Sequence, residues 1–265
     1  MNLFACPICQ APLRRKDVLL RCTGSHSFDI SREGYVNLLP AHHRKSRLPG
    51  DNAEMVAARR RILAEHHFEP LVTALRTEIE AKGTVDRLVD IGCGEGSITA
   101  SFSSSVPQVY GVDVSKAAIR AAARQYKPLI LAVSSSTRLP LLDKAFEVAT
   151  VILAPFSGDI SRVVETGGKA IRVTPGPDHL SQLKELIYRN ARPHRRAVVE
   201  FPLLRHIGHT RIEFDLTLDR QSRTDFINMT PMRYRSNPAL RIPANEPEQM
   251  RITADFWIDV FERTQ

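Results

Sequence analysis

The chain has 265 residues, 43% of them hydrophobic and 25% charged, which is enough for a full core in one medium domain and for a small appendage. Its formal net charge of +8 favours a polyanionic partner such as nucleic acid. No apolar run approaches the roughly 18 residues of a membrane span, and the first residues lack the basic start and apolar core of a signal peptide, so we expect a cytoplasmic protein with no membrane partner.

Three of the four cysteines lie within the first 22 residues, and their spacing is typical of a metal site. Cys6 and Cys9 are followed after twelve residues by Cys22 and after three more by His26. Zn²⁺ takes four tetrahedral nitrogen or sulfur ligands, and two such pairs complete the set. Because no position is left for a reactive water, the pattern predicts a structural or recognition role. The alternative is ordinary reduced cysteines beside a surface histidine.

A small zinc ribbon needs its own apolar residues around the ion, and four are available: Phe4, Leu13, Leu20 and Phe28. A segment this short depends on metal binding for its folding free energy. We expect three parts in the chain: the ribbon at 1–38, a basic linker at 39–52 and the main domain at 53–265. Three basic clusters, at 42–47, 59–61 and 189–196, fit contact with nucleic acid, although any one of them can equally be solvated surface.

The main domain begins with a helical pattern and continues with an alternating one. Asp51 or Asn52 can cap a helix that runs past Ile62, breaks near 66–70 and resumes to about Lys82. Strands are predicted at 88–91, 109–112, 129–133, 148–153 and 169–173, with helices at 97–104, 116–126, 159–164 and 178–189. This alternation predicts an α/β fold with a parallel sheet and helices on both faces. The tail offers runs at 200–207, 211–218 and 250–261 and a helix at 221–229, from which two strands should close the sheet edge.

The first predicted strand ends in a glycine-rich turn, Asp90-Ile91-Gly92-Cys93-Gly94-Glu95-Gly96. Glycines at Gly92, Gly94 and Gly96 let the backbone turn sharply and approach a ligand closely. Their spacing differs from the G-x-G-x-x-G of dinucleotide sites, which hold a pyrophosphate. S-adenosylmethionine instead brings an ammonium and a carboxylate, so the acidic residue Asp90 beside the glycines fits that cofactor.

A second acidic residue follows at the end of the next strand. Asp113 lies about 20 residues beyond the turn, where a carboxylate can accept hydrogen bonds from both ribose hydroxyls. Turn, acid and strand order together predict a class I S-adenosylmethionine-dependent methyltransferase, with a Rossmann-like seven-stranded sheet behind the N-terminal ribbon.

The fourth predicted strand ends in Ala154-Pro155-Phe156, at the edge where the methyl acceptor should lie. Enzymes that methylate exocyclic amines usually carry Asp or Asn there, and this sequence has neither. Methylation of a pyrimidine carbon needs a cysteine nucleophile, but outside the ribbon only Cys93 occurs, inside the cofactor turn. Direct transfer to a heteroatom remains, with Phe156 either a stacking surface for a flipped base or a core aromatic.

These motifs together resemble those of the bacterial 23S rRNA (guanine-N1)-methyltransferases, over nearly the whole chain. The matching segments are the four zinc ligands, 33–40 (EGYVNLLP), 49–51, the glycine turn, 139–140, 174–177 and 229–231. One departure is 164–168, where the family's proline before the glycines is missing, which affects only a turn. The resemblance implies that the ribbon docks a 23S rRNA hairpin and that N1 of one guanine is methylated, guanine-745 rather than guanine-748. It also makes a homodimer plausible.

The resemblance further implies site residues. The zinc ligands are Cys6, Cys9, Cys22 and His26, and the cofactor contacts are Gly94, Glu95, Phe68 and His179. Guanine N1 carries a proton that must leave before its lone pair can attack, so a general base is needed. The candidates are Asp51, Asp178 and His179, each of which can instead be a helix cap or a cofactor contact.

Two hypotheses from other classes remain open at this point. One is a small-molecule methyltransferase with an incidental zinc ribbon. The other is a non-catalytic, zinc-dependent RNA-binding protein that retains the cofactor fold. The identity of the methyl acceptor distinguishes the small-molecule methyltransferase from an rRNA methyltransferase. Cofactor binding distinguishes an rRNA methyltransferase from the non-catalytic RNA-binding protein.

Overall fold

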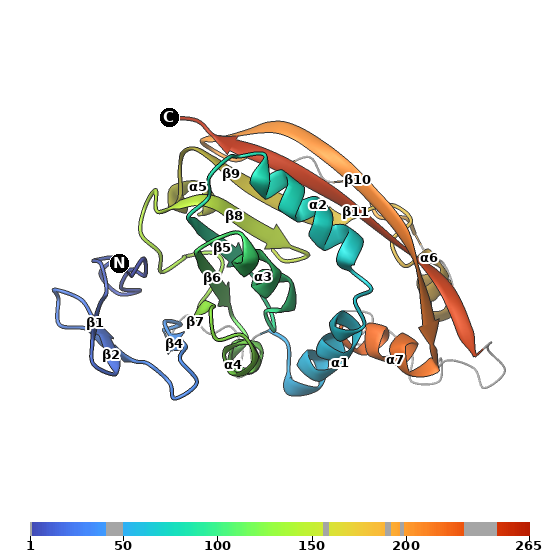
Figure 1. Cartoon of the computed structure of the whole chain (residues 1–265), viewed down its shortest axis with the longest axis horizontal. Helices are drawn as coiled ribbons and strands as arrows, with labels where there is room; N and C mark the ends of the chain where they lie inside the picture. The colour runs from blue at the N-terminus through green and yellow to red at the C-terminus, as the bar shows by residue number, and fades with distance from the viewer. Residues whose placement is uncertain (1, 41–49, 156–158, 189–191, 197–198, 231–247) are drawn as a thin grey trace.

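The computed structural model describes residues 2–40, 50–155, 159–188, 192–196, 199–230 and 248–265 (Figure 1). Within this part of the chain the large sheet has eight strands in the order β10-β11-β9-β8-β5-β6-β7-β4. They are β4 (Val36–Asn37), β5 (Arg87–Ile91), β6 (Gln108–Asp113), β7 (Ile130–Val133), β8 (Phe146–Ile152), β9 (Val164–Pro175), β10 (Leu204–Asp219) and β11 (Gln249–Arg263). The pairings from β4 to β9 are parallel, and β11 runs antiparallel to both β9 and β10. The predicted parallel sheet with two closing strands is confirmed.

The helices follow the predicted order. They are α1 (Ala53–Ala64), α2 (Glu69–Glu80), α3 (Ser97–Ser101) with the 3-10 helix η2 (Phe102–Ser104), α4 (Lys116–Gln125), α5 (Ile160–Val163), α6 (Ser181–Ile187) and α7 (Arg220–Asn228). Asn52 caps α1, since its Oδ1 accepts a hydrogen bond from the Met55 amide at 3.0 Å. None of the helices in the described ranges has the length and apolar character needed to cross a membrane.

Two elements differ from the expectation. The runs 200–207 and 211–218 were predicted as separate segments, but β10 is continuous, because a register shift between His206 and Gly208 keeps it paired with β11. The last residues of the predicted ribbon at 1–38 form β4 of the large sheet, where Val36 pairs with Ala132 of β7, so the sheet has one strand more than the seven predicted.

The two faces of the large sheet are covered differently. On one face, α2, η2 and α4 pack against strand residues such as Leu88 and Val109 (Figure 1). On the other, the ribbon shares a core with α5 and the sheet. The Phe4 ring meets Tyr110 of β6 edge-on at 5.4 Å, and the Leu3 amide donates a hydrogen bond to the Tyr110 hydroxyl at 3.3 Å. The ribbon therefore takes part of the place that the sequence assigned to helices.

The ribbon itself is a three-stranded antiparallel sheet of β1 (Arg14–Lys16), β2 (Leu19–Arg21) and β3 (Ser27–Asp29). Three of its four predicted core residues, Phe4, Leu13 and Leu20, are buried, and Phe28 is partly buried. The predicted miniature core is present.

Candidate active site

The four predicted zinc ligands lie together at one end of the ribbon. One nitrogen or sulfur atom of each, from Cys6, Cys9, Cys22 and His26, lies within 4.8 Å of all the others. His26 Nδ1 is 3.5 Å from Cys6 Sγ and 3.4 Å from Cys22 Sγ. Burial raises the pKa of Cys22, but hydrogen bonds from the His26 backbone and the neighbouring side chains lower it to about 7. This donor set fits one Zn²⁺ in a closed tetrahedral site.

The glycine turn joins β5 to α3 in a backbone conformation that residues with a Cβ atom rarely adopt. Gly92 and Gly94 have φ angles of +81° and +57°, in the left-handed region. A Cβ at Gly92 would lie 2.4 Å from the Ala154 Cβ, and one at Gly94 would lie 3.1 Å from Arg59 Nη1. The backbone therefore comes close to the end of β8 and to α1, as a tight ligand site requires.

Asp113 at the end of β6 fixes the turn. Its Oδ2 accepts a hydrogen bond from the Gly94 amide at 3.0 Å and its Oδ1 accepts one from the Ser115 amide at 2.7 Å. Burial raises the pKa of Asp113, while these two amide bonds oppose the rise. Each carboxylate oxygen retains a further lone pair, which fits the predicted contact with ribose hydroxyls.

The other two acids of the turn are engaged within the chain. Asp90 accepts hydrogen bonds from the hydroxyls of Thr99 in α3 and Thr150 in β8, and its burial raises its pKa to about 6. Glu95 accepts hydrogen bonds from the Ser97 amide at 3.0 Å and the Ser97 hydroxyl at 2.8 Å. Both acids thus hold the start of α3, and their predicted contact with the cofactor stays a prediction.

Cys93, the one cysteine outside the ribbon, has the environment of an inert thiol. Burial raises its pKa well above the usual value, and the negative charges of Asp113, Asp90 and Glu95 raise it further. Because the thiolate is the nucleophilic form, these surroundings agree with the sequence argument against covalent catalysis.

Phe68 and His179, the cofactor contacts that the family resemblance implies, both lie beside Phe256, in a cluster separate from the glycine turn. The Phe68 ring lies 6.0 Å from both Phe226 and Phe256, and the His179 ring lies 4.6 Å from Phe256. His179 Nδ1 accepts a hydrogen bond from the Asp255 amide at 3.3 Å. Burial, followed by the charge of a nearby lysine, lowers the His179 pKa to about 3, so the ring is neutral.

The remaining base candidates, Asp51 and Asp178, lie in different surroundings. The Ser115 hydroxyl donates a hydrogen bond to the Asp51 carbonyl at 2.6 Å, which places Asp51 beside the cofactor turn. Its carboxylate forms an ion pair with Arg59 at 2.8 Å. Asp178 is exposed and pairs with Arg211 of β10, also at 2.8 Å. Of the two, only Asp51 lies at the turn.

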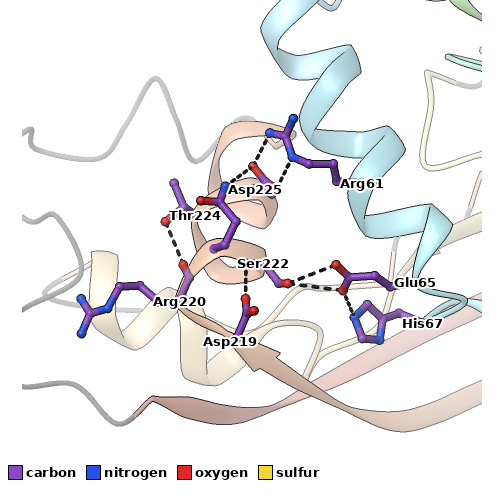
Figure 2. A network of polar contacts seen from close by, with 9 residues as sticks. Arg61, Glu65, His67, Asp219, Arg220, Ser222, Thr224 and Asp225 are labelled. Carbon is purple, nitrogen blue, oxygen red and sulfur yellow. Dashed lines mark hydrogen bonds and ion pairs between the residues drawn. The ribbon is translucent and has the colours of Figure 1, made fainter.

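Sequence reasoning missed the role of α1 at this site. The sequence left the cluster 59–61 open between nucleic-acid contact and solvated surface. In the structure Arg59 donates to the Met229 carbonyl at 3.0 Å, and Arg61 donates twice to the Asp225 carboxylate (Figure 2). Helical spacing contained the signal, because Arg59 lies on the same face of α1 as the buried residues Met55 and Ile62.

The structure describes part of the sheet edge at the end of β8, where the methyl acceptor is expected. Leu153 at the end of β8 is exposed and has a φ of +53°, and Ala154 next to it contacts the turn at Gly92. A bulky residue held in the left-handed region is a strained feature of the kind found at functional sites. Phe156, the predicted stacking residue, lies outside the described residues, as do the basic cluster 42–47 and part of 189–196.

Comparisons with known proteins agree with this geometry. Residues 4–47 match the family model described as "RlmA, N-terminal", and residues 89–171 match "Methyltransferase domain". The chain is 35% identical over 249 residues to the 23S rRNA (guanine(748)-N(1))-methyltransferase of Streptomyces fradiae, covering 90% of this chain and 88% of the relative. It is 30% identical to the putative 23S rRNA (guanine-N(1)-)-methyltransferase YxjB of Bacillus subtilis (strain 168), covering 96% and 95%.

A third relative, a putative 23S rRNA (guanine-N(1)-)-methyltransferase of Micromonospora griseorubida, is 35% identical, with 88% of each chain covered. The two family-model matches include the ribbon and the glycine turn. With S-adenosylmethionine and Zn²⁺ as its cofactors, the chain belongs to the family of 23S rRNA (guanine-N1)-methyltransferases.

Proposed function

We propose that this protein transfers the methyl group of S-adenosylmethionine to N1 of one guanine in a hairpin of 23S rRNA. The observation that carries the proposal is the packing of a zinc ribbon directly on the sheet of the methyltransferase domain, through Leu3, Phe4 and Tyr110. An incidental ribbon would not need to share a core with the catalytic sheet. This arrangement supports a ribbon that presents RNA to the domain.

Three parts follow from this proposal. The ribbon, within 1–38, recognises the hairpin, the basic segment 39–52 links it to the domain, and 53–265 performs the transfer. We retain guanine-745 as the proposed position and a homodimer as the proposed assembly. The exposed residues Arg192 and Arg195 of the third basic cluster are available for phosphate contacts.

The chemistry requires removal of the N1 proton, and the environments of the three candidates favour Asp51 as the base. The lowered pKa of His179 and the hydrogen bond that its Nδ1 accepts argue against proton uptake by that ring near neutral pH. Asp178 lies away from the turn, where it pairs with Arg211 on β10. Asp51 is a carboxylate beside the turn, where the methyl donor is expected.

The test is transfer of label from S-adenosylmethionine carrying a radioactive methyl group, with the full-length protein and two acceptors. One acceptor is 23S rRNA from cells that lack the mark, and the other is a small-molecule extract. The proposal predicts label in the rRNA. Preferential label in small molecules would support the metabolite methyltransferase instead, and RNA binding without cofactor binding would support a non-catalytic RNA-binding protein.

A further inference from the structure

The glycine turn is rich in acids, and four of its amides are occupied. The amides of Gly92 and Cys93 donate to the Val112 carbonyl at 2.8 and 3.1 Å, and the Gly94 amide donates to Asp113. The Gly96 amide donates to the Cys93 carbonyl at 3.1 Å. S-adenosylmethionine brings an amino-acid carboxylate as well as an ammonium. A carboxylate bound here needs a donor other than these four amides, and a positive charge to offset the acids.

Arg59 of α1 meets both needs. Its Nη1 lies 3.1 Å from the position that a Cβ on Gly94 would occupy, so the guanidinium lies directly over the turn. Its Nη2 is 2.8 Å from the Asp51 carboxylate and donates to the Met229 carbonyl at 3.0 Å. A planar guanidinium has five N–H donors and binds carboxylates in a fork. It already holds one carboxylate, that of Asp51, at this place.

The neighbouring helix fixes the position of Arg59. The Arg61 side chain donates two hydrogen bonds to Asp225 of α7, at 2.6 and 2.7 Å (Figure 2). Glu65, which follows α1 about one helical turn after Arg61, accepts a hydrogen bond from the Ser222 hydroxyl of α7 at 3.3 Å. Met229, whose carbonyl accepts from Arg59, directly follows α7. Helix α7 therefore orients α1 so that Arg59 faces the turn.

We infer that Arg59 binds the carboxylate of S-adenosylmethionine over Gly94, in exchange for or together with its ion pair with Asp51. Arg59 is not among the site residues that the sequence predicted. The inference rests on the proposed function only through the cofactor, since it concerns cofactor binding and not RNA. Where Arg59 exchanges its partner, cofactor binding also frees the Asp51 carboxylate that we propose as the base.

The experiment compares two ligands by calorimetry with the full-length, zinc-loaded protein: S-adenosylmethionine and its decarboxylated analogue, which keeps the amine and the sulfonium. Hydrogen bonds to a charged group predict that the native chain prefers the carboxylate form by roughly 10- to 100-fold. In Arg59→Met this preference falls to about 1, while affinity for the analogue changes by less than about threefold. Arg60→Met is the matched control, because Arg60 is exposed and bonds Gln125, and it should keep the native preference.

Two results would overturn the inference. One is that Arg59→Met weakens both ligands equally, as a purely structural role predicts; the other is that it retains the native preference. If Arg59→Met does not fold, Arg59→Gln, which keeps a polar side chain without the positive charge, should lose the preference in the same way, and a retained preference there contradicts the inference. Failure of the native chain to bind S-adenosylmethionine would overturn the cofactor assignment too. If the native chain shows the expected preference for S-adenosylmethionine but transfers no methyl group to rRNA, the proposed function alone is overturned.

Discussion

The Arg61 guanidinium holds the Asp225 carboxylate through two parallel hydrogen bonds, from Nε to Oδ2 at 2.6 Å and from Nη2 to Oδ1 at 2.7 Å. Asp225 is almost completely buried and also accepts a hydrogen bond from Gln221 at 3.2 Å. This pair joins α1, which lies over the cofactor turn, to α7, whose Phe226 packs on Phe68. It helps to connect the predicted cofactor residues of the glycine turn with those beside Phe256, namely Phe68 and His179.

Arg61→Met is expected to lower the stability of the protein and to weaken cofactor binding. The substitution leaves a buried carboxylate without its main partner, which is costlier than loss of a surface pair. Urea unfolding and calorimetry with S-adenosylmethionine measure the two effects. Arg60→Met is the control with an exposed side chain on the same helix. If Arg61→Met has the same unfolding midpoint and the same cofactor affinity as Arg60→Met, the contact between α1 and α7 does not support the site.

Gly92→Ala is expected to destabilise the protein by about 2 kcal/mol or more, from left-handed backbone strain and overpacking. The new Cβ would lie 2.4 Å from Ala154 Cβ, so β8 and the turn must separate. Cofactor affinity should fall with stability. Gly83→Ala is the matched control, since Gly83 also has a positive φ but has open space around it. Equal losses in the two variants would mean that the close approach at Gly92 is unimportant.

Asp90→Asn should remove a pH dependence of stability. Because the pKa of Asp90 is raised from 3.8 to about 6 in the folded protein, the unfolded chain loses its proton first as pH rises. Asp90 therefore lowers the free energy of unfolding between about pH 4 and pH 6, by roughly 3 kcal/mol in total, with no further change above. Chemical unfolding across this range should show the variant gaining stability relative to the native chain. Parallel pH curves for the two proteins would contradict this account.

Zinc removal should separate RNA recognition from cofactor binding. Cys9→Ser, or chelation of the native protein, is expected to unfold the ribbon, lower overall stability and abolish methyl transfer to rRNA. Cofactor affinity should be largely retained, since the turn joins β5 to α3 and is held by Asp113 of β6, all of which lie outside the ribbon. Metal content, calorimetry and transfer assays measure these effects. Cys93→Ser is the control that keeps the zinc, and equal loss of metal in both variants would contradict the assigned ligand set.

The sequence predicted the parts of this protein that local patterns encode. The spacing of Cys6, Cys9, Cys22 and His26 predicted a cluster that the structure confirms, because tetrahedral coordination restricts ligand spacing. The alternation of apolar runs and helical patterns predicted the sheet and the order of its helices along the chain. The glycines of the turn were recognisable because few other residues adopt a positive φ.

What the sequence did not indicate depends on contacts between distant segments. Arg59 was grouped with a basic cluster because its neighbours in sequence are basic, whereas its role depends on Met229, 170 residues away. The contact of Asp90 with the cofactor stays a prediction, but its hydroxyl partners Thr99 and Thr150 were not predicted, because they come from two other elements. The second face of the sheet was assigned to helices because nothing local shows that the ribbon packs there.

The most direct test is primer extension on 23S rRNA that lacks the mark, after incubation with the protein and S-adenosylmethionine. A methyl group on N1 blocks base pairing, so reverse transcriptase stops beside the modified guanine. The account predicts one new stop within a single hairpin, at guanine-745, that depends on the cofactor and is lost in Arg59→Met. A new stop at guanine-748 would correct the position alone. No cofactor-dependent stop anywhere in the rRNA, with a folded and zinc-loaded protein, would contradict the proposed function.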